Sequence, residues 1–142
     1  MNIVLWIVQG LLALAFLLAG FMKTFRPVET LKKNMDWVRV VPTSFVRFIG
    51  VSEILGAIGL ILPAITGIGT WLTMAAAAGL VVVMASASIF HASRREYSAI
   101  GMNAVLLLLA VLVIVGRLTF APLAWTHGMT EVRRLPSPRS EM

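Results

Sequence analysis

The sequence predicts an all-α protein: a four-helix transmembrane bundle with a short amphipathic interfacial helix between helices 1 and 2. Of its 142 residues, 59% are hydrophobic and 13% are charged, whereas soluble domains hold about 25% charged residues. The mean hydropathy is +0.94. The apolar residues gather in four stretches of about 20 residues, enough for each to cross roughly 30 Å of hydrocarbon as a helix. This composition excludes an ordinary water-soluble globule.

We predict membrane helices over residues 3–22, 45–62, 71–90 and 99–116. No basic residue precedes the first stretch, and the apolar run continues beyond Ala13 and Ala15, so we expect it to stay a membrane helix and not to be a cleaved signal. Pro63 is expected to end the second helix, and Thr43 or Ser44 to cap its start. None of the four stretches shows the alternation of a membrane β-barrel strand.

The connection between the first two membrane helices carries its own helical pattern. From residue 27 to 39, Val28, Leu31, Met35 and Val38 recur at spacings of three and four, with charged residues between them. Pro27 suits the first turn of a helix. We expect one short amphipathic helix here, which lies along the membrane surface or caps the bundle as a solvated helix.

The distribution of basic residues predicts the orientation in the membrane. The loop side bears the connections after the first and third membrane helices; the termini side bears both chain ends and the connection around residues 63–70. Cytoplasmic segments accumulate lysine and arginine, so we predict a multi-pass inner-membrane protein with the loop side cytoplasmic and both termini external. We divide the chain into a membrane domain, residues 1–117, and a partly disordered tail, residues 118–142. Eight cations lie on the loop side: Lys23, Arg26, Lys32, Lys33, Arg39, Arg47, Arg94 and Arg95.

Polar residues at membrane depth are the strongest functional signal in the sequence. By counting along each helix, five of them fall in the loop-side half, where small residues on the same helix faces indicate close helix contacts. We predict that they form a polar vestibule that is open to the loop side, with Glu53 as its deepest ionisable group. The vestibule either fixes helix order through ion pairs or binds a polar ligand. Its predicted residues are Lys23, Arg47, Glu53, His91 and Asn103.

Several other kinds of site are excluded or unsupported. The chain has no cysteine, which excludes disulfides, thiol relays and cysteine-ligated clusters. His91 and His127 fall on opposite sides of the predicted topology, so an intrachain bis-histidine haem is not expected, and no metal site is predicted. Phosphate-binding and hydrolase motifs are absent. Although the pI is about 11.2, the cations border apolar stretches, which favours lipid headgroups over nucleic acid as their partners.

Three segments resemble the DoxX-like family of small four-helix membrane proteins: residues 19–23, 50–60 and 90–97. The order and spacing of these segments also resemble the family, and the resemblance covers the chain up to about Arg117. It implies a four-helix bundle in which Lys23, Glu53, His91 and Asn103 are the positions of interest. Relatives are linked to quinone-coupled membrane oxidoreductases and to oxidative-stress detoxification, and more distant ones act as assembly factors. The lack of cysteine argues against a role in thiol exchange.

The leading functional hypothesis is an accessory or anchor subunit of an oxidoreductase system, which binds a quinone- or lipid-like molecule in the vestibule. Because the sequence holds no electron carrier, a redox role would need a bound small molecule or a membrane or soluble oxidoreductase partner. The alternative is a non-enzymatic scaffold or assembly chaperone that packs against partner helices. Transport is less favoured, since four short helices would have to form a homo-oligomer to enclose a path.

Overall fold

The computed structural model describes residues 2–120, and these residues form helices without any strand. The four long helices are long and apolar enough to cross a membrane, which confirms the predicted fold class. His127 and all but the first three residues of the predicted tail lie outside the described residues. The elements are α1 (Asn2–Phe25), α2 (Val28–Asn34), the 3-10 helix η1 (Asp36–Arg39), α3 (Thr43–Thr66), α4 (Trp71–Ser93) and α5 (Tyr97–Thr119).

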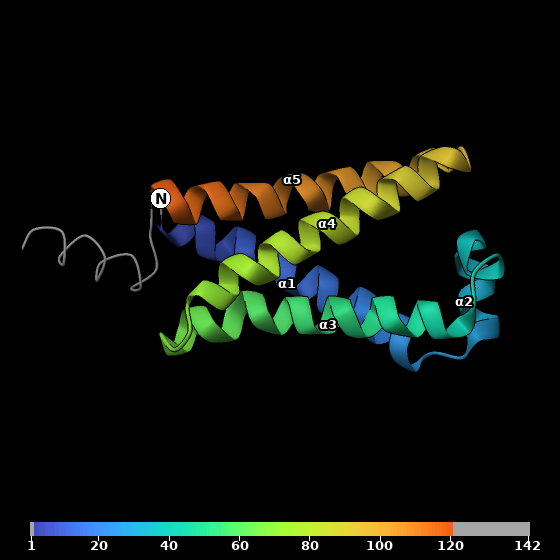
Figure 1. The fold of residues 1–142 in the computed structure, drawn as a ribbon, viewed down its shortest axis with the longest axis horizontal. Coiled ribbons are helices and arrows are strands. Elements are labelled where there is room, and N and C mark those ends of the chain that lie inside the picture. The colour runs from blue at the N-terminus through green and yellow to red at the C-terminus, as the bar shows by residue number, and fades with distance from the viewer. Residues whose placement is uncertain (1, 121–142) are drawn as a thin grey trace, which may run out of the picture.

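The long helices alternate in direction, so that the start of α1 and the end of α5 lie at one end of the bundle and α2 lies at the other (Figure 1). These two ends are the termini side and the loop side of the predicted topology. In the view of Figure 1, α3 and α5 run along opposite edges while α1 and α4 run diagonally between them. As a result, α1 contacts α5 on the termini side and α3 on the loop side.

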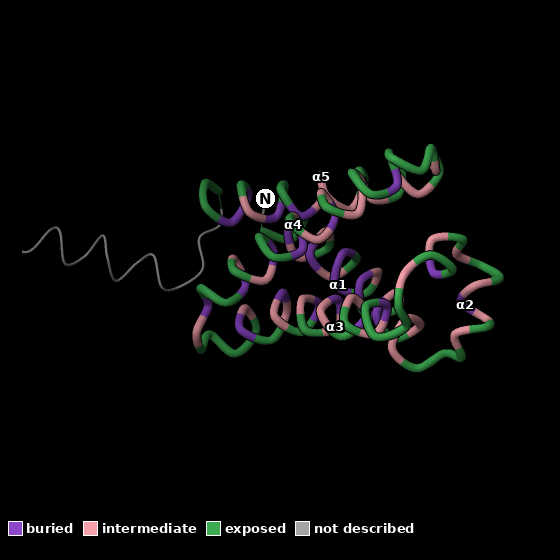
Figure 2. The backbone as a smooth tube through the Cα atoms, turned by 45° about the vertical axis from the view of Figure 1, so that its right-hand side comes forward, coloured by how far each residue is buried: buried purple, intermediate pink, exposed green. Residues whose placement is uncertain are grey.

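The apolar core lies where the diagonal helices meet their neighbours. Its buried side chains come from all four long helices, whereas the large apolar side chains on the outer faces are exposed, as a bilayer solvent requires (Figure 2). Among residues 97–109 of α5 none is fully buried, so this loop-side half contributes little to the core. The core residues are Leu12, Ala13, Phe16, Ala57, Leu60, Ala77, Leu80, Met84, Ala110 and Val113.

The single amphipathic helix expected over residues 27–39 is instead two short pieces. The chain is extended at Met35, with φ −139° and ψ 99°, between α2 and η1. In one straight helix, Leu31 and Val38 would lie about 10 Å apart along the axis. The break lets both side chains pack into one small cluster with Val46 at the start of α3. Burial of these residues therefore overrides the helical continuity that their spacing predicted.

The prediction that Pro63 ends the second membrane helix is wrong. Helix α3 continues through Pro63 to Thr66 and ends at Gly67, whose backbone adopts the left-handed φ of 72°. A proline removes only one backbone N–H donor from the helix. Within a membrane no water is present to bind the other backbone groups, so their helical hydrogen bonds are kept and the helix continues. At the other end of α3, Pro42 occupies the capping position, and neither Thr43 nor Ser44 caps the helix through its side chain.

Candidate functional site

The deepest predicted ionisable residue on the loop side is paired with a cation from the neighbouring helix. Lys23, near the end of α1, donates a hydrogen bond from Nζ to Glu53 Oε1 on α3 at 2.5 Å. The Glu53 side chain is 2% exposed and that of Lys23 is 13% exposed. Such a pair satisfies two charges that would be costly alone in a low-dielectric interior. The predicted approach of Lys23 and Glu53 is therefore present in the fold.

Two glycines bring the helices that carry this pair together. A Cβ atom built on Gly20 would lie 2.6 Å from the carbonyl oxygen of Gly50, and one built on Gly50 would lie 2.5 Å from Thr24 Oγ1. Only a residue without a side chain fits at either position. The close approach of α1 and α3 thereby places Lys23 and Glu53 within hydrogen-bonding distance.

Arg47 lies beside the pair but does not contact Glu53. Its guanidinium reaches from α3 to the end of α1, where Nη1 donates to the Lys23 carbonyl oxygen at 2.6 Å and Nη2 to that of Arg26 at 2.8 Å. The Lys23 carbonyl belongs to the last turn of α1 and that of Arg26 to the residue after the helix. Carbonyl groups at a helix end have no further backbone donors within the helix and carry partial negative charge. Arg47 therefore caps α1 and holds it against α3.

His91 forms a separate group at the turn between α4 and α5. Its Nδ1 lies 2.5 Å from Glu96 Oε2, and Arg94 Nε donates to Glu96 Oε1 at 2.7 Å. The hydrogen bonds with His91 and then Arg94 hold the pKa of Glu96 below its ordinary value. The edge of the imidazole also contacts Trp37 of η1, with ring centroids 6.3 Å apart. Sequence reasoning missed Glu96, whose position five residues after His91 was the available signal.

The five predicted vestibule residues therefore fall into distinct places. The contact between Gly56 and Leu80 sets α3 beside α4, so that His91 lies about eight residues, or roughly 12 Å, farther toward the loop side than Glu53. Asn103 is half-buried on α5, and its Nδ2 has no hydrogen-bond partner. Glu53 Oε2 and Thr24 Oγ1 are likewise buried without a partner. Ligand binding by the five residues stays a prediction.

A second polar group, on the termini side, was not predicted. Arg117 of α5 is 3% exposed; its Nε donates to Gln9 Oε1 at 3.0 Å and its Nη1 to Asn2 Oδ1 at 2.9 Å. Gln9 in turn donates to the Leu60 carbonyl oxygen at 2.5 Å. The available signal was a glutamine in the middle of an apolar stretch. The predicted membrane helix over residues 99–116 ends just before Arg117, whereas α5 continues to Thr119 and includes this residue.

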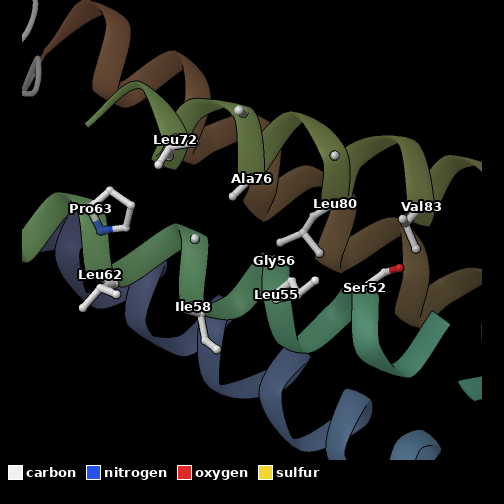
Figure 3. A pocket seen from close by; sticks show the side chains of 13 residues that line it. Ser52, Leu55, Gly56, Ile58, Leu62, Pro63, Leu72, Ala76, Leu80 and Val83 are labelled. Carbon is white, nitrogen blue, oxygen red and sulfur yellow. The ribbon is translucent and has the colours of Figure 1, made fainter. Parts of the chain in front are cut away.

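A groove runs between α3 and α4 on the outer surface of the bundle (Figure 3). It has a volume of about 480 Å³. It is lined by small residues, among them Gly59, Ala76 and Gly79, and by aliphatic side chains. Ser52 is the hydroxyl residue at its loop-side end, near Val83 (Figure 3). Because the groove opens on a surface formed by membrane-crossing helices, it faces acyl chains.

Comparison with known proteins agrees with this fold. The family model of the DoxX-like family matches residues 7–113. The chain belongs to the DoxX-like family. The matched segment contains most of all four long helices and every predicted vestibule residue. Searches of curated proteins and of solved structures find no match to the chain.

As a DoxX-like protein, the chain is a membrane protein with four helices able to cross the bilayer. Within residues 2–120, no three histidine, aspartate or glutamate side chains come together in a way that could hold a metal ion. The polar chemistry of the described chain is thus divided between the Lys23–Glu53 pair, the His91–Glu96 turn and the Arg117 network.

Proposed function

We propose that this DoxX-like protein is an integral membrane accessory or anchor subunit that binds a quinone- or lipid-like molecule and supports an oxidoreductase partner. The observation that carries the proposal is the groove between α3 and α4. Its volume of about 480 Å³ falls within the range of small-molecule sites, which are mostly apolar with a few polar groups that fix orientation. An isoprenoid or acyl chain has the apolar, flexible form that such a groove accepts.

The polar end of the groove suggests how the bound molecule would be oriented. Ser52 donates its hydroxyl hydrogen to the Phe48 carbonyl oxygen at 2.8 Å, so its oxygen remains able to accept a hydrogen bond. Near the depth of Ser52 lie two buried oxygens without hydrogen-bond partners among residues 2–120, Glu53 Oε2 and Thr24 Oγ1. Residues 52 and 53 point to different faces of α3, so a head group at Ser52 would lie next to the Lys23–Glu53 pair and not within it. A quinone or lipid head would therefore face the loop side.

The chemistry of the chain supports the proposal of a partner subunit. Without cysteine, the protein has no thiol couple of its own, so electrons would be carried by the bound molecule or by a partner. The family resemblance favours an oxidoreductase partner. An accessory role of this kind requires only that the subunit bind and present the small molecule.

One observation favours the alternative, a scaffold or assembly chaperone. A Cβ atom built on Gly79 meets nothing within 4 Å, so this small residue is not required by packing within the chain. Small residues on outward faces let a partner helix approach closely in membranes. A transmembrane helix of another protein is therefore the competing occupant of the same groove.

Filling the groove separates the two functions. Gly79→Leu places a large side chain in the groove without disturbing contacts within the chain, and Gly101→Leu, equally open, is the matched control on α5. The protein and both variants would be purified in mild detergent, and bound small molecules and proteins identified by mass spectrometry. We expect a quinone or lipid to be retained by the wild type and by Gly101→Leu, and lost from Gly79→Leu.

The other outcomes are equally informative. If a membrane protein, but no small molecule, is lost from Gly79→Leu, the scaffold function is favoured. If the small molecule binds equally to all three proteins, the groove is not its site, and the proposal fails.

We also propose that the protein resides in the inner membrane with the loop side in the cytoplasm and both termini external. The support is the charge distribution, because eight of the twelve lysines and arginines lie on the loop side. A reporter that is active only in the cytoplasm, fused to the C-terminus, should be inactive. Strong reporter activity would reverse the orientation.

A further inference from the structure

The termini-side end of the bundle holds a buried positive charge that has no acidic partner among residues 2–120. Arg117 is 3% exposed, and its two hydrogen-bonded side-chain partners, Gln9 and Asn2, are neutral amides. One face of the guanidinium is covered by the Trp6 ring, whose centroid lies 4.7 Å from Cζ. Its Nη2 is buried and has no hydrogen-bond partner within the described part of the chain. A charge of this kind is costly to bury unless an anion compensates it.

No acidic residue of residues 2–120 is available to compensate this charge. The four acidic side chains of that part of the chain all lie on the loop side, where Glu29 and Asp36 belong to α2 and η1, Glu53 pairs with Lys23, and Glu96 lies in the turn after α4. The helices that separate the two ends span about 36 Å, and over this distance no loop-side carboxylate reaches Arg117. An anion that compensates Arg117 therefore comes from outside residues 2–120.

The network orients the guanidinium toward the start of α1. Gln9 donates its amide hydrogen to the Leu60 carbonyl oxygen, which turns its Oε1 toward Arg117 Nε. Nη1 is bonded to Asn2, the first residue of α1. The first turn of α1 contains no acidic residue, and its backbone N–H groups lack partners within the helix. The free Nη2 and the positive end of α1 thus lie side by side, and both favour an anion.

We propose that Arg117 and the first turn of α1 bind a phosphate group, presented by a phospholipid of the termini-side leaflet. Arg117 is two residues from the end of α5, and Trp6 lies beside it, at the depth where aromatic rings and head groups meet. A guanidinium donates paired hydrogen bonds to phosphate oxygens in its own plane. This site is independent of the groove between α3 and α4 and of the function proposed for it.

The test measures the thermal stability of the full chain in a non-ionic detergent. Phosphatidylglycerol is added in one arm, a diacyl galactolipid without phosphate in a second, and inorganic phosphate against chloride of equal ionic strength in a third. We expect phosphatidylglycerol alone to raise the Tm. A rise with inorganic phosphate alone keeps the phosphate site but overturns its assignment to a lipid, and no rise in any phosphate arm overturns the site.

Variants connect the response to Arg117. Arg117→Gln should lose the Tm increment, because losing one charge-assisted hydrogen bond weakens binding about tenfold. Arg39→Gln removes an equal charge from an exposed loop-side residue and should keep the increment. If both variants behave alike, the increment reflects net charge, and the proposal fails.

A second variant covers the case in which Arg117→Gln does not fold. Asn2→Asp places a carboxylate where the amide oxygen of Asn2 now lies, 2.9 Å from Arg117 Nη1. It supplies the missing counter-charge from within the chain. We expect a higher Tm without lipid and a smaller increment with phosphatidylglycerol. An increment as large as that of the wild type would overturn the proposal.

Discussion

Replacing Gly20 by alanine tests the close crossing of α1 and α3 that carries the Lys23–Glu53 pair. The new Cβ would lie 2.6 Å from the Gly50 carbonyl oxygen, whereas ordinary contact begins at 3.4 Å. The two backbones must therefore separate by about 0.8 Å, the difference between these two distances, because neither atom belongs to a flexible side chain. Such a shift also lengthens the hydrogen bond of 2.5 Å between Lys23 and Glu53.

The expected cost follows from two opposing effects. Overpacking a close contact destabilises a protein by about 1–3 kcal/mol, while alanine in place of glycine favours a helix by about 0.5–1 kcal/mol. We expect Gly20→Ala to lower the free energy of unfolding by about 1–2 kcal/mol. Gly10→Ala is the matched control, because it lies on the same helix and its added Cβ meets nothing within 4 Å. This control should be neutral or raise the free energy of unfolding.

The two variants are compared by equilibrium unfolding in mixed detergent micelles, in which rising dodecyl sulfate is followed by far-ultraviolet circular dichroism. The sign of the difference is the decisive result. If Gly20→Ala is as stable as Gly10→Ala, α1 and α3 do not approach as closely as the structure shows, and the geometric basis of the Lys23–Glu53 pair is lost.

Three further predictions concern the loop side. Arg47→Gln removes two hydrogen bonds to the end of α1 and should cost about 1–3 kcal/mol in the same unfolding assay. The pKa of Glu96 is lower in the folded protein than in the unfolded chain. Glu96 therefore stabilises the fold above its unfolded pKa, and this stabilisation is lost as the pH falls through its folded pKa. Glu96→Gln should flatten the decline of Tm between about pH 6 and about pH 3. Glu53→Gln should keep the fold and the co-purified small molecule, because the groove lies beside the Lys23–Glu53 pair and its lining includes neither residue. Loss of the molecule from a folded variant would move its site to the pair, and misassembly would show that the pair is structural.

Much of the fold could be predicted because the bilayer restricts what a sequence can do. A run of about 20 apolar residues has almost no alternative to a membrane-spanning helix. The residues at which helices end were harder to predict. Pro63 lies inside α3 and does not end it, because the other backbone hydrogen bonds of the helix are kept. The break at Met35 was not visible either, because it depends on tertiary packing of Leu31 and Val38 against Val46.

The candidate site was predictable in part, for a related reason. Periodicity places Glu53 on the face of α3 that carries Gly50, and at Gly50 this face meets α1 beside Lys23. Periodicity does not determine which helices are neighbours, or at which depth their residues lie. It therefore could not predict that His91 and Glu53 belong to different groups of side chains. The burial of Arg117 was not predictable, because a cation after an apolar run usually extends toward water, whereas here its guanidinium donates hydrogen bonds to Gln9 and Asn2.

Buried charges are compensated differently at the two ends of the bundle. On the loop side each of the two carboxylates that are not exposed pairs with a cation of the chain, Glu53 with Lys23 and Glu96 with Arg94. On the termini side Arg117 has only amides and an aromatic ring among residues 2–120. An internally compensated end is stable without a ligand, whereas an uncompensated end is stabilised by whatever anion it binds. Stability should therefore respond to phospholipid through Arg117, while a groove ligand acts through Gly79, and the two responses should be additive because the sites share no residue.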